Sequence, residues 1–291
     1  MRFMLLTLLL MNLFGCGHRF FYSPKSADVM RIGSGIDNYF LDSRSGNQLH
    51  VQLHSPPGYA KGTVIHFHGN RGHLDETGEK ALWLVNEGYQ VLLFDYSGFG
   101  LSGGKASKEA LALDARSLLE HAVARPNFHS LPRIILATSM GGAIALDGLA
   151  QSGLEHQFDL LVLDSSFDDY LLLAQDVVST YPGGTLWRNL MPLLINTDDA
   201  PKERIRSLNH LPVVISHCSQ DRLIPAIRSI QLYEAAQTQK EFWLMPLCAH
   251  ARTFTSDHPQ HQSRLLLRFD QLATPSLPSR RSQLAGPSAN P

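Results

Sequence analysis

The chain has 291 residues, of which 44% are hydrophobic and 18% charged, so it is suited to a globular core and is not a disordered protein. Lys and Arg number 25 against 26 Asp and Glu, a net charge of −1 that lacks the basic excess of nucleic-acid-binding proteins. The three cysteines include no C-x-x-C pair, which excludes a disulfide-rich miniprotein and the usual zinc-finger spacing.

The first residues are typical of an export signal. Arg2 precedes an apolar run from Phe3 to Phe14, which is shorter than the roughly 20 residues of a membrane-spanning helix. The adjoining Leu13-Phe14-Gly15-Cys16 resembles the lipobox of bacterial lipoprotein precursors, in which the cysteine is acylated and the preceding segment removed. The resemblance implies a signal peptide over 1–15 and a lipidated Cys16 that holds the protein at the cell-envelope membrane, facing the periplasm. A secreted or soluble periplasmic protein is the alternative.

The rest of the chain alternates short apolar runs with amphipathic stretches, a pattern that predicts an α/β fold whose mostly parallel sheet is covered by helices on both faces. We expect a linker over 16–30, this domain over 31–273 and a disordered, Pro/Ser-rich tail over 274–291. The stretch 165–211 has helical pieces but no strand, which predicts a cap insertion over a site. The expected strands are 36–42 and 48–54 as a hairpin, then 63–67, 89–94, 133–137, 160–163, 212–216 and 241–245, with helices near 75–86, 107–124 and 140–151.

A nucleophilic serine is indicated where the third strand after the hairpin meets its helix. The apolar run from Arg133 leads directly into Ser139, and Gly141 and Gly142 open the helix that follows. This is the strand–turn–helix setting of the nucleophile elbow G-x-S-x-G, with Ala137 in place of the first glycine. At this point the chain resembles the α/β-hydrolase family, in its serine esterase, thioesterase and aminopeptidase-like branch.

Two further segments strengthen the resemblance. His68-Gly69-Asn70 follows a strand and is similar to the family's H-G-x motif, which implies an oxyanion hole built from the backbone N–H groups of Asn70 and Met140. The loop from Asp95 to Gly104 is similar to the D-x-R-G-x-G-x-S loop, with Ser97 in place of the arginine. It also matches G-x-G-x-x-G, but it lies ahead of its helix and no ribose-binding acid is well placed, so we expect no dinucleotide cofactor.

The same resemblance completes a Ser-His-Asp triad. Asp221 lies in a segment similar to G-x-x-D-x-x-V-P, and His250 lies at the family's terminal histidine position. Rival candidates for the acid are Asp164, Asp168 and Asp169, and rival bases are His258 and His261.

Other residues leave alternatives open. His66, His68 and His73 are close in sequence, but no carboxylate cluster accompanies them, so we expect structural histidines and no metal. Cys218 and Cys248 follow strands that are neighbours in the family's sheet, and are either a disulfide linking the acid and histidine loops or two buried thiols.

The resemblance implies a serine hydrolase that needs no cofactor and cleaves an ester or thioester through an acyl-enzyme. Apolar residues of the cap suit a hydrophobic acyl substrate, although they equally suit a cap that is merely sealed onto the sheet. The alternatives are an aminopeptidase-like amidase with an acidic subsite, an acyltransferase, and a non-catalytic envelope binding protein. Residues that could supply the acidic subsite are Asp168, Asp169, Asp198 and Asp199.

Overall fold

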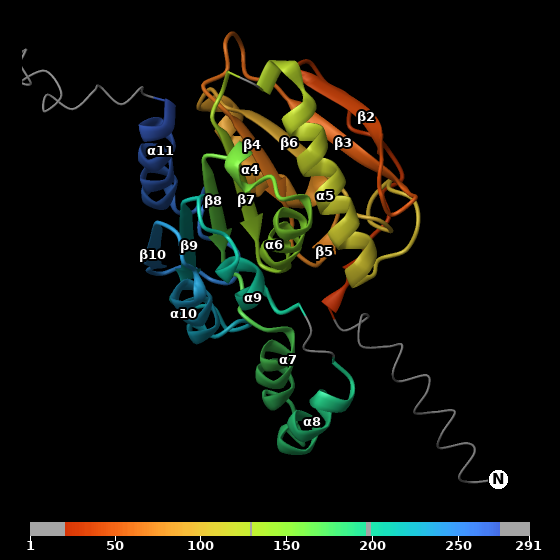
Figure 1. Ribbon diagram of the computed structural model, residues 1–291, viewed down its shortest axis with the longest axis vertical. Helices are drawn as coiled ribbons and strands as arrows, with labels where there is room; N and C mark the ends of the chain where they lie inside the picture. Colours follow the sequence, from red (N-terminus) through yellow and green to blue (C-terminus); the bar gives the residue numbers. More distant parts are fainter. Residues whose placement is uncertain (1–20, 129, 196–198, 274–291) are drawn as a thin grey trace, which may run out of the picture.

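A computed structural model describes residues 21–128, 130–195 and 199–273. The expected signal peptide, Cys16 and the expected tail lie outside these residues. The described chain forms an eight-stranded sheet in the order β10-β9-β8-β7-β4-β6-β3-β2, with helices on both faces (Figure 1). The six strands from β10 to β6 run parallel, and the hairpin β2–β3 adds two antiparallel strands at one edge. The predicted α/β fold is therefore confirmed.

Most predicted strands are confirmed to within two residues at either end. The strands are β1 Ser23–Pro24, β2 Ile36–Asp42, β3 Gln48–His54, β4 Thr63–Phe67, β5 Arg71–Gly72, β6 Gln90–Phe94, β7 Arg133–Thr138, β8 Leu160–Asp164, β9 Val213–Cys218 and β10 Lys240–Met245. The α-helices are α3 Leu74–Thr77, α4 Glu79–Asn86, α5 Lys108–Ala124, α6 Met140–Ser152, α7 Tyr170–Ser179, α8 Gly184–Leu190, α9 Pro201–Arg206, α10 Ala226–Ala235 and α11 Pro259–Ala273.

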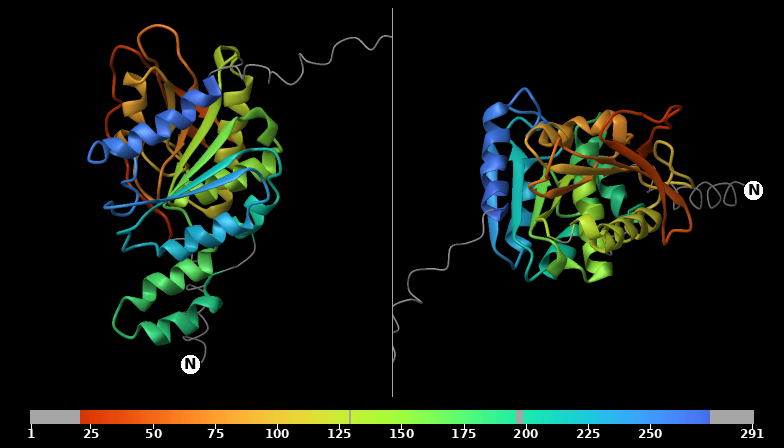
Figure 2. Two further views of the ribbon diagram at one scale, coloured as in Figure 1. Left: turned by 90° about the vertical axis from the view of Figure 1, so that its left-hand side faces the viewer. Right: turned by 90° about the horizontal axis from the view of Figure 1, so that it is seen from above.

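The central strands are apolar throughout because successive side chains enter two different cores. In β4, Ile65 and Phe67 face the core formed with α5, α6, α9 and α10, whereas Val64 faces the core formed with α4 and α11. Ile135 and Ile134 of β7 divide in the same way. Figure 2 shows the helices of the two layers on either side of the twisted sheet.

Two segments differ from expectation. The helix expected over 75–86 is divided into α3 and α4 at Gly78, where a Cβ atom would lie 2.7 Å from both the Leu74 carbonyl oxygen and the Leu93 side chain. The stretch expected to be a linker is packed onto the domain from Phe21 onward: β1 pairs with β5, and the Tyr22 side chain is buried. A two-residue strand has no periodicity by which the sequence could reveal it.

The insertion after β8 is helical, as its sequence predicts. It contains α7, α8 and α9, and α7 and α8 project beyond the carboxyl ends of the parallel strands (Figure 1). A small apolar cluster seats it on the domain, with Phe167, Tyr170 and Leu173 packed against Ala143 of α6 and Ile224. Among the described residues, no helix is long and apolar enough to cross a bilayer.

Candidate active site

Ser139 lies at the tight turn between β7 and α6. Its backbone has φ 55° and ψ −121°, a conformation that residues other than glycine rarely adopt and that commonly marks a functional site. The turn brings α6 against β4 so closely that a Cβ atom on Gly141 would lie 2.2 Å from the Phe67 carbonyl oxygen. Ala137, which replaces the first glycine of the motif, is accommodated because its methyl group packs in the buried core beneath the helices.

The loops after β9 and β10 bring an aspartate and a histidine to this serine. The His250 Nε2 atom lies 3.0 Å from Ser139 Oγ, and its Nδ1 atom lies 2.7 Å from Asp221 Oδ2. Parallel strands place the loops after β7, β9 and β10 at one edge of the sheet, so the three residues meet although they are distant in sequence. A proton on Nδ1 donated to Asp221 leaves Nε2 free to accept the proton of the serine hydroxyl.

Asp221 is held in its charged form. Burial alone would raise its pKa, but the hydrogen bond from His250 and the backbone N–H groups of Leu223 and Ile224 outweigh burial, and the pKa is lowered. His217, which the sequence analysis did not single out, lies behind this loop with Nε2 3.6 Å from Asp221 Oδ2. Its ring is fully buried and also contacts the Ile224 carbonyl and the Ser229 hydroxyl, so it fixes the shape of the loop.

Two unused backbone donors lie beside the serine. Asn70 and Met140 line the same cavity as Ser139. Met140 is the first residue of α6, where an N–H group has no partner within the helix. Within the described ranges neither N–H group donates a hydrogen bond, whereas the Asn70 carbonyl is held by the Ser23 N–H at 3.0 Å. Both groups are therefore available to an anionic oxygen formed at the serine.

The rival acids have other partners. Asp164 is buried and accepts hydrogen bonds from Ser165, Ser216 and Thr253. Asp168 pairs with Arg228, and Asp169 caps the start of α7 and pairs with Lys202. None of these three carboxylates contacts His250, whereas Asp221 does.

The rival histidines are also occupied elsewhere. His261 contacts the Thr253 carbonyl and stacks on His258, and neither ring contacts Ser139. Burial lowers the pKa of His66 to about 3 and that of His68 to about 4, which keeps both rings neutral at physiological pH. The one grouping of potential metal ligands among the described residues is Glu155, His156 and His210 on the surface, apart from the serine.

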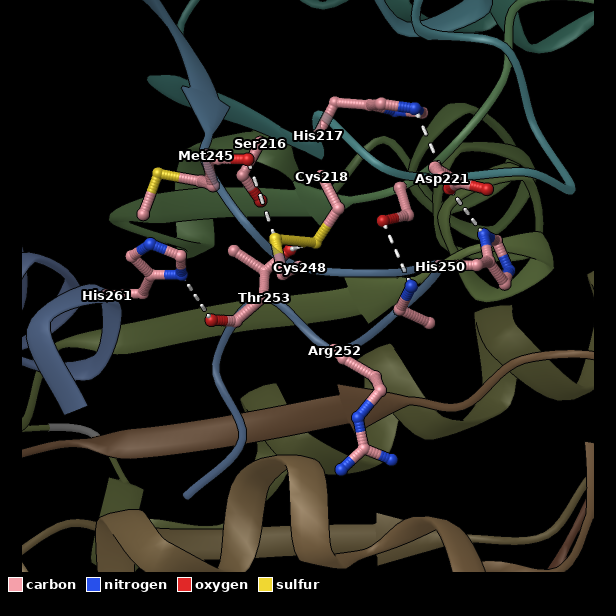
Figure 3. Close-up of a disulfide and its surroundings, with 12 residues drawn as sticks. Ser216, His217, Cys218, Asp221, Met245, Cys248, His250, Arg252, Thr253 and His261 are labelled. Atoms are coloured by element: carbon pink, nitrogen blue, oxygen red, sulfur yellow. Dashed lines mark hydrogen bonds and ion pairs between the residues drawn. A yellow bond between two sulfur atoms is a disulfide. The ribbon is translucent and has the colours of Figure 1, made fainter. Parts of the chain in front are cut away.

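The two cysteines form a disulfide in the structure, which was one of the two possibilities left open by the sequence. Cys218 ends β9 and Cys248 lies in the loop after β10, so the bond joins the Asp221 loop to the His250 loop (Figure 3). Backbone hydrogen bonds from Ser219 to Met245 and from Gln220 to Cys248 link the same loops.

The cavity beside Ser139 has a volume of about 610 Å³. Much of its wall is apolar and comes from the cap and from the N-terminal segment: Phe21, Phe167, Leu173, Val177 and Tyr181. Phe21 packs edge-on against Tyr170 of α7 at a ring-centroid distance of 5.0 Å. Sequence reasoning missed Phe21 because its place in the wall depends on tertiary packing.

This strand order, with a serine at a strained turn after a central strand and a helical insertion above it, defines an α/β-hydrolase fold. Comparisons with known proteins agree. Residues 58–170 match the family model described as serine aminopeptidase, S33. A Mycobacterium tuberculosis protein, Rv2307c, is 34% identical over 234 residues, covering 78% of this chain and 75% of its own length. The Escherichia coli K12 protein YfhR is 27% identical over 239 residues, covering 81% and 77%. The chain belongs to the α/β-hydrolase family.

Solved structures show the same fold at low sequence identity. The Pyrococcus furiosus esterase Pf2001 superimposes with a TM-score of 0.68 at 19% identity, covering 87% of this chain and 100% of its own. Acetyl xylan esterase 1 from Thermoanaerobacterium superimposes with a TM-score of 0.60 at 14% identity, covering 89% and 93%.

Proposed function

We propose that this protein is a serine hydrolase that cleaves esters or thioesters of apolar acids through an acyl-enzyme. The hydrogen-bond chain from Asp221 through His250 to Ser139, which ends in a largely apolar cavity, carries the proposal.

The geometry supports a balanced two-step reaction. His250 Nε2 takes the proton of Ser139 as Oγ bonds to the substrate carbonyl carbon, and the N–H groups of Asn70 and Met140 hold the resulting oxyanion. Collapse breaks the bond to the alcohol or thiol, which leaves with the proton from His250. Water then attacks the acyl-enzyme with His250 again as the base, and releases the acid and Ser139.

The residues that line the cavity favour an ester or thioester of an apolar acid over a peptide with a protonated N-terminal amine. An aminopeptidase needs a carboxylate for the substrate's protonated amine, and no carboxylate of the described residues lines this cavity. Asp168, Asp169 and Asp199 are paired with Arg228, Lys202 and Arg204, while Asp198 lies outside the described residues.

A fluorophosphonate probe tests the proposal, because it labels only an activated serine. The chain from Gly17 suits this test since it keeps every residue that the structure describes. We expect labelling of the parent chain and none of Ser139→Ala. A folded parent chain without labelling contradicts the proposal and favours a binding protein on a hydrolase scaffold.

We also propose that Cys16 is acylated and anchors the mature protein to the bacterial envelope membrane. The support is its position directly after the apolar run in the Leu-Phe-Gly-Cys segment.

A further inference from the structure

The cavity beside Ser139 has a second, cationic part of its wall. Whereas the cap contributes aromatic and aliphatic side chains, the segment from β5 to α4 contributes Arg71, Thr77 and Lys80. Two basic side chains and no carboxylate line the cavity within the described part of the chain. The pocket is therefore amphipathic, and the sign of its polar part is positive.

Arg71 has no ion-pair partner in the part of the chain that the structure describes. Most arginines of the described residues pair with a carboxylate, as Arg204 does with Asp147 and Arg228 with Asp168. No described carboxylate lies within 4.0 Å of the Arg71 guanidinium, and Arg71 is an exposed residue of the cavity wall. A planar guanidinium in this state is ready to bind a phosphate or carboxylate through two parallel hydrogen bonds.

Lys80 adds positive charge deeper in the wall. Its Nζ donates to the Ala251 carbonyl at 2.5 Å, directly after the triad histidine, and leaves two further N–H donors. Burial lowers the pKa of Lys80, while the buried Asp164 carboxyl opposes that change. Asp164 does not line the cavity, so it moderates the charge of Lys80 without offering a negative group to a ligand.

Arg71 directly follows a residue of the candidate oxyanion hole and lines the same cavity as Ser139. Arg71 directly follows Asn70, whose N–H is available to the substrate carbonyl oxygen, and adjacent Cα atoms are about 3.8 Å apart. An anionic group held by Arg71 would therefore belong to the same bound molecule as a carbonyl at Ser139. The apolar acyl chain of a substrate would pack against the cap side of the wall. The alcohol or thiol portion of the substrate would then lie against the cationic side.

We propose that the substrates are esters or thioesters of apolar acids whose alcohol or thiol portion carries a phosphate or carboxylate, bound by Arg71. This inference rests on the proposed hydrolase function. Hydrolysis of such an ester gives an apolar carboxylic acid and an anionic alcohol, with water as the only co-reactant.

Binding provides a test that needs no turnover. Decyl phosphate and the neutral 1-O-decylglycerol, both below their micelle concentrations, are titrated by calorimetry into the chain from Gly17. We expect decyl phosphate to bind about tenfold more tightly, equivalent to about 1.4 kcal/mol. Arg71→Gln should remove that difference. Arg222→Gln is the matched control, because Arg222 is also exposed and has no ion pair among the described residues, but it lines only the neighbouring hollow and not the cavity beside Ser139. It should keep the difference.

Three binding results would overturn the inference. These are equal affinity for the charged and neutral ligands, loss of the preference in both arginine variants alike, and inorganic phosphate binding as tightly as decyl phosphate. The last result would mean that the apolar wall makes no contribution to binding.

Turnover separates this inference from the proposed function. The specificity constants kcat/KM for 1-decanoylglycerol 3-phosphate and 1-decanoylglycerol should differ about tenfold in the parent chain and become equal in Arg71→Gln. Equal hydrolysis by the parent chain overturns the inference and leaves the hydrolase function standing. Arg71-dependent binding of decyl phosphate, with neither ester cleaved and Ser139 unlabelled, contradicts the hydrolase function but supports the anion site.

Discussion

Some residues of the site would contact the substrate directly, and others hold those residues in position. Asp221 belongs to the second kind, since it contacts His250 through Nδ1 and is itself fixed by two backbone N–H groups. In the proposed reaction, its negative charge stabilises the imidazolium that forms when Ser139 loses its proton.

Asp221→Asn should lower kcat by about 10²- to 10⁴-fold, because an amide favours the wrong imidazole tautomer and supplies no charge. Hydrolysis of a soluble ester at pH 7 measures the loss. Asp168→Asn is the control, since Asp168 is also buried but pairs with Arg228 away from His250. Full activity in Asp221→Asn together with a large loss in Asp168→Asn would mean that the acid has been wrongly assigned.

Asp95 is a buried carboxyl that anchors the start of α3 and does not line the cavity beside Ser139. Its Oδ1 atom accepts the Leu74 N–H at 2.7 Å, and burial raises its pKa from 3.8 to about 8. The folded protein therefore keeps a proton on Asp95 that the unfolded chain loses well below neutral pH. Between these two pKa values the folded state binds more protons, so this group lowers the free energy of unfolding as pH rises.

Asp95→Asn removes this penalty, since an amide is uncharged and keeps an oxygen for Leu74. The stability of the variant relative to the parent chain should increase steadily from about pH 6.5 to 8 and level off above the folded pKa. Urea unfolding across this range measures the difference. The effect of the buried His66 and His68 on stability is common to the parent chain and the variant, so it cancels in the difference between them. A constant difference across the window would show that Asp95 is ionised in the folded protein.

At the scale of elements, the site depends on two loops that follow neighbouring strands. The Cys218–Cys248 bond joins the loops after β9 and β10 and closes a segment with a sequence separation of 30. Cross-linking a loop of this size restricts the unfolded chain and is worth about 3–4 kcal/mol in the chain-entropy model. The two backbone hydrogen bonds between the loops remain when the sulfur link is removed.

The double variant Cys218→Ala/Cys248→Ala should therefore lose about 3–4 kcal/mol of stability in urea unfolding. Its kcat should fall by less than in Asp221→Asn, since the backbone bonds still hold the two loops together. A reducing agent should destabilise the parent chain and leave the variant unchanged. Mass mapping under non-reducing conditions that recovers both thiols free would contradict the disulfide.

The parts predictable from sequence are those determined by local patterns. Strands buried on both faces form apolar runs, so β4 was predicted with its exact bounds and β7 to within one residue. Ser139, Asp221 and His250 were singled out because each follows such a strand in a recognisable motif, and the structure brings the three side chains into contact. Phe21 and Lys80 were not singled out, because residues distant in sequence bring them to the cavity. The division of the expected helix at Gly78 was also missed, because the sequence there continues the apolar pattern of a single helix.

At the scale of the whole molecule, the N-terminal segment connects the cavity to the proposed membrane anchor. Phe21 lines the cavity, and β1 fixes the next residues against β5. Cys16 is five positions earlier in the sequence, a length of chain that spans at most about 18 Å. With an acylated Cys16, the cavity therefore lies close to the bilayer surface, where an ester of an apolar acid partitions.

A change in the length of this connection should separate two activities. Twenty Gly/Ser residues inserted between Cys16 and Gly17 add a flexible chain with a mean span of about 25 Å. Hydrolysis of a water-soluble ester should stay unchanged, whereas hydrolysis of a long-chain ester in the cell's own membranes should fall several-fold. The same insertion after Ala273 is the control and should affect neither activity.

Cys16→Ser should move the protein from the membrane fraction to the soluble fraction, and an unchanged distribution would contradict the proposed anchor. If the insertion between Cys16 and Gly17 lowered hydrolysis of the soluble ester and of the long-chain ester equally, the insertion would be disturbing the packing of Phe21.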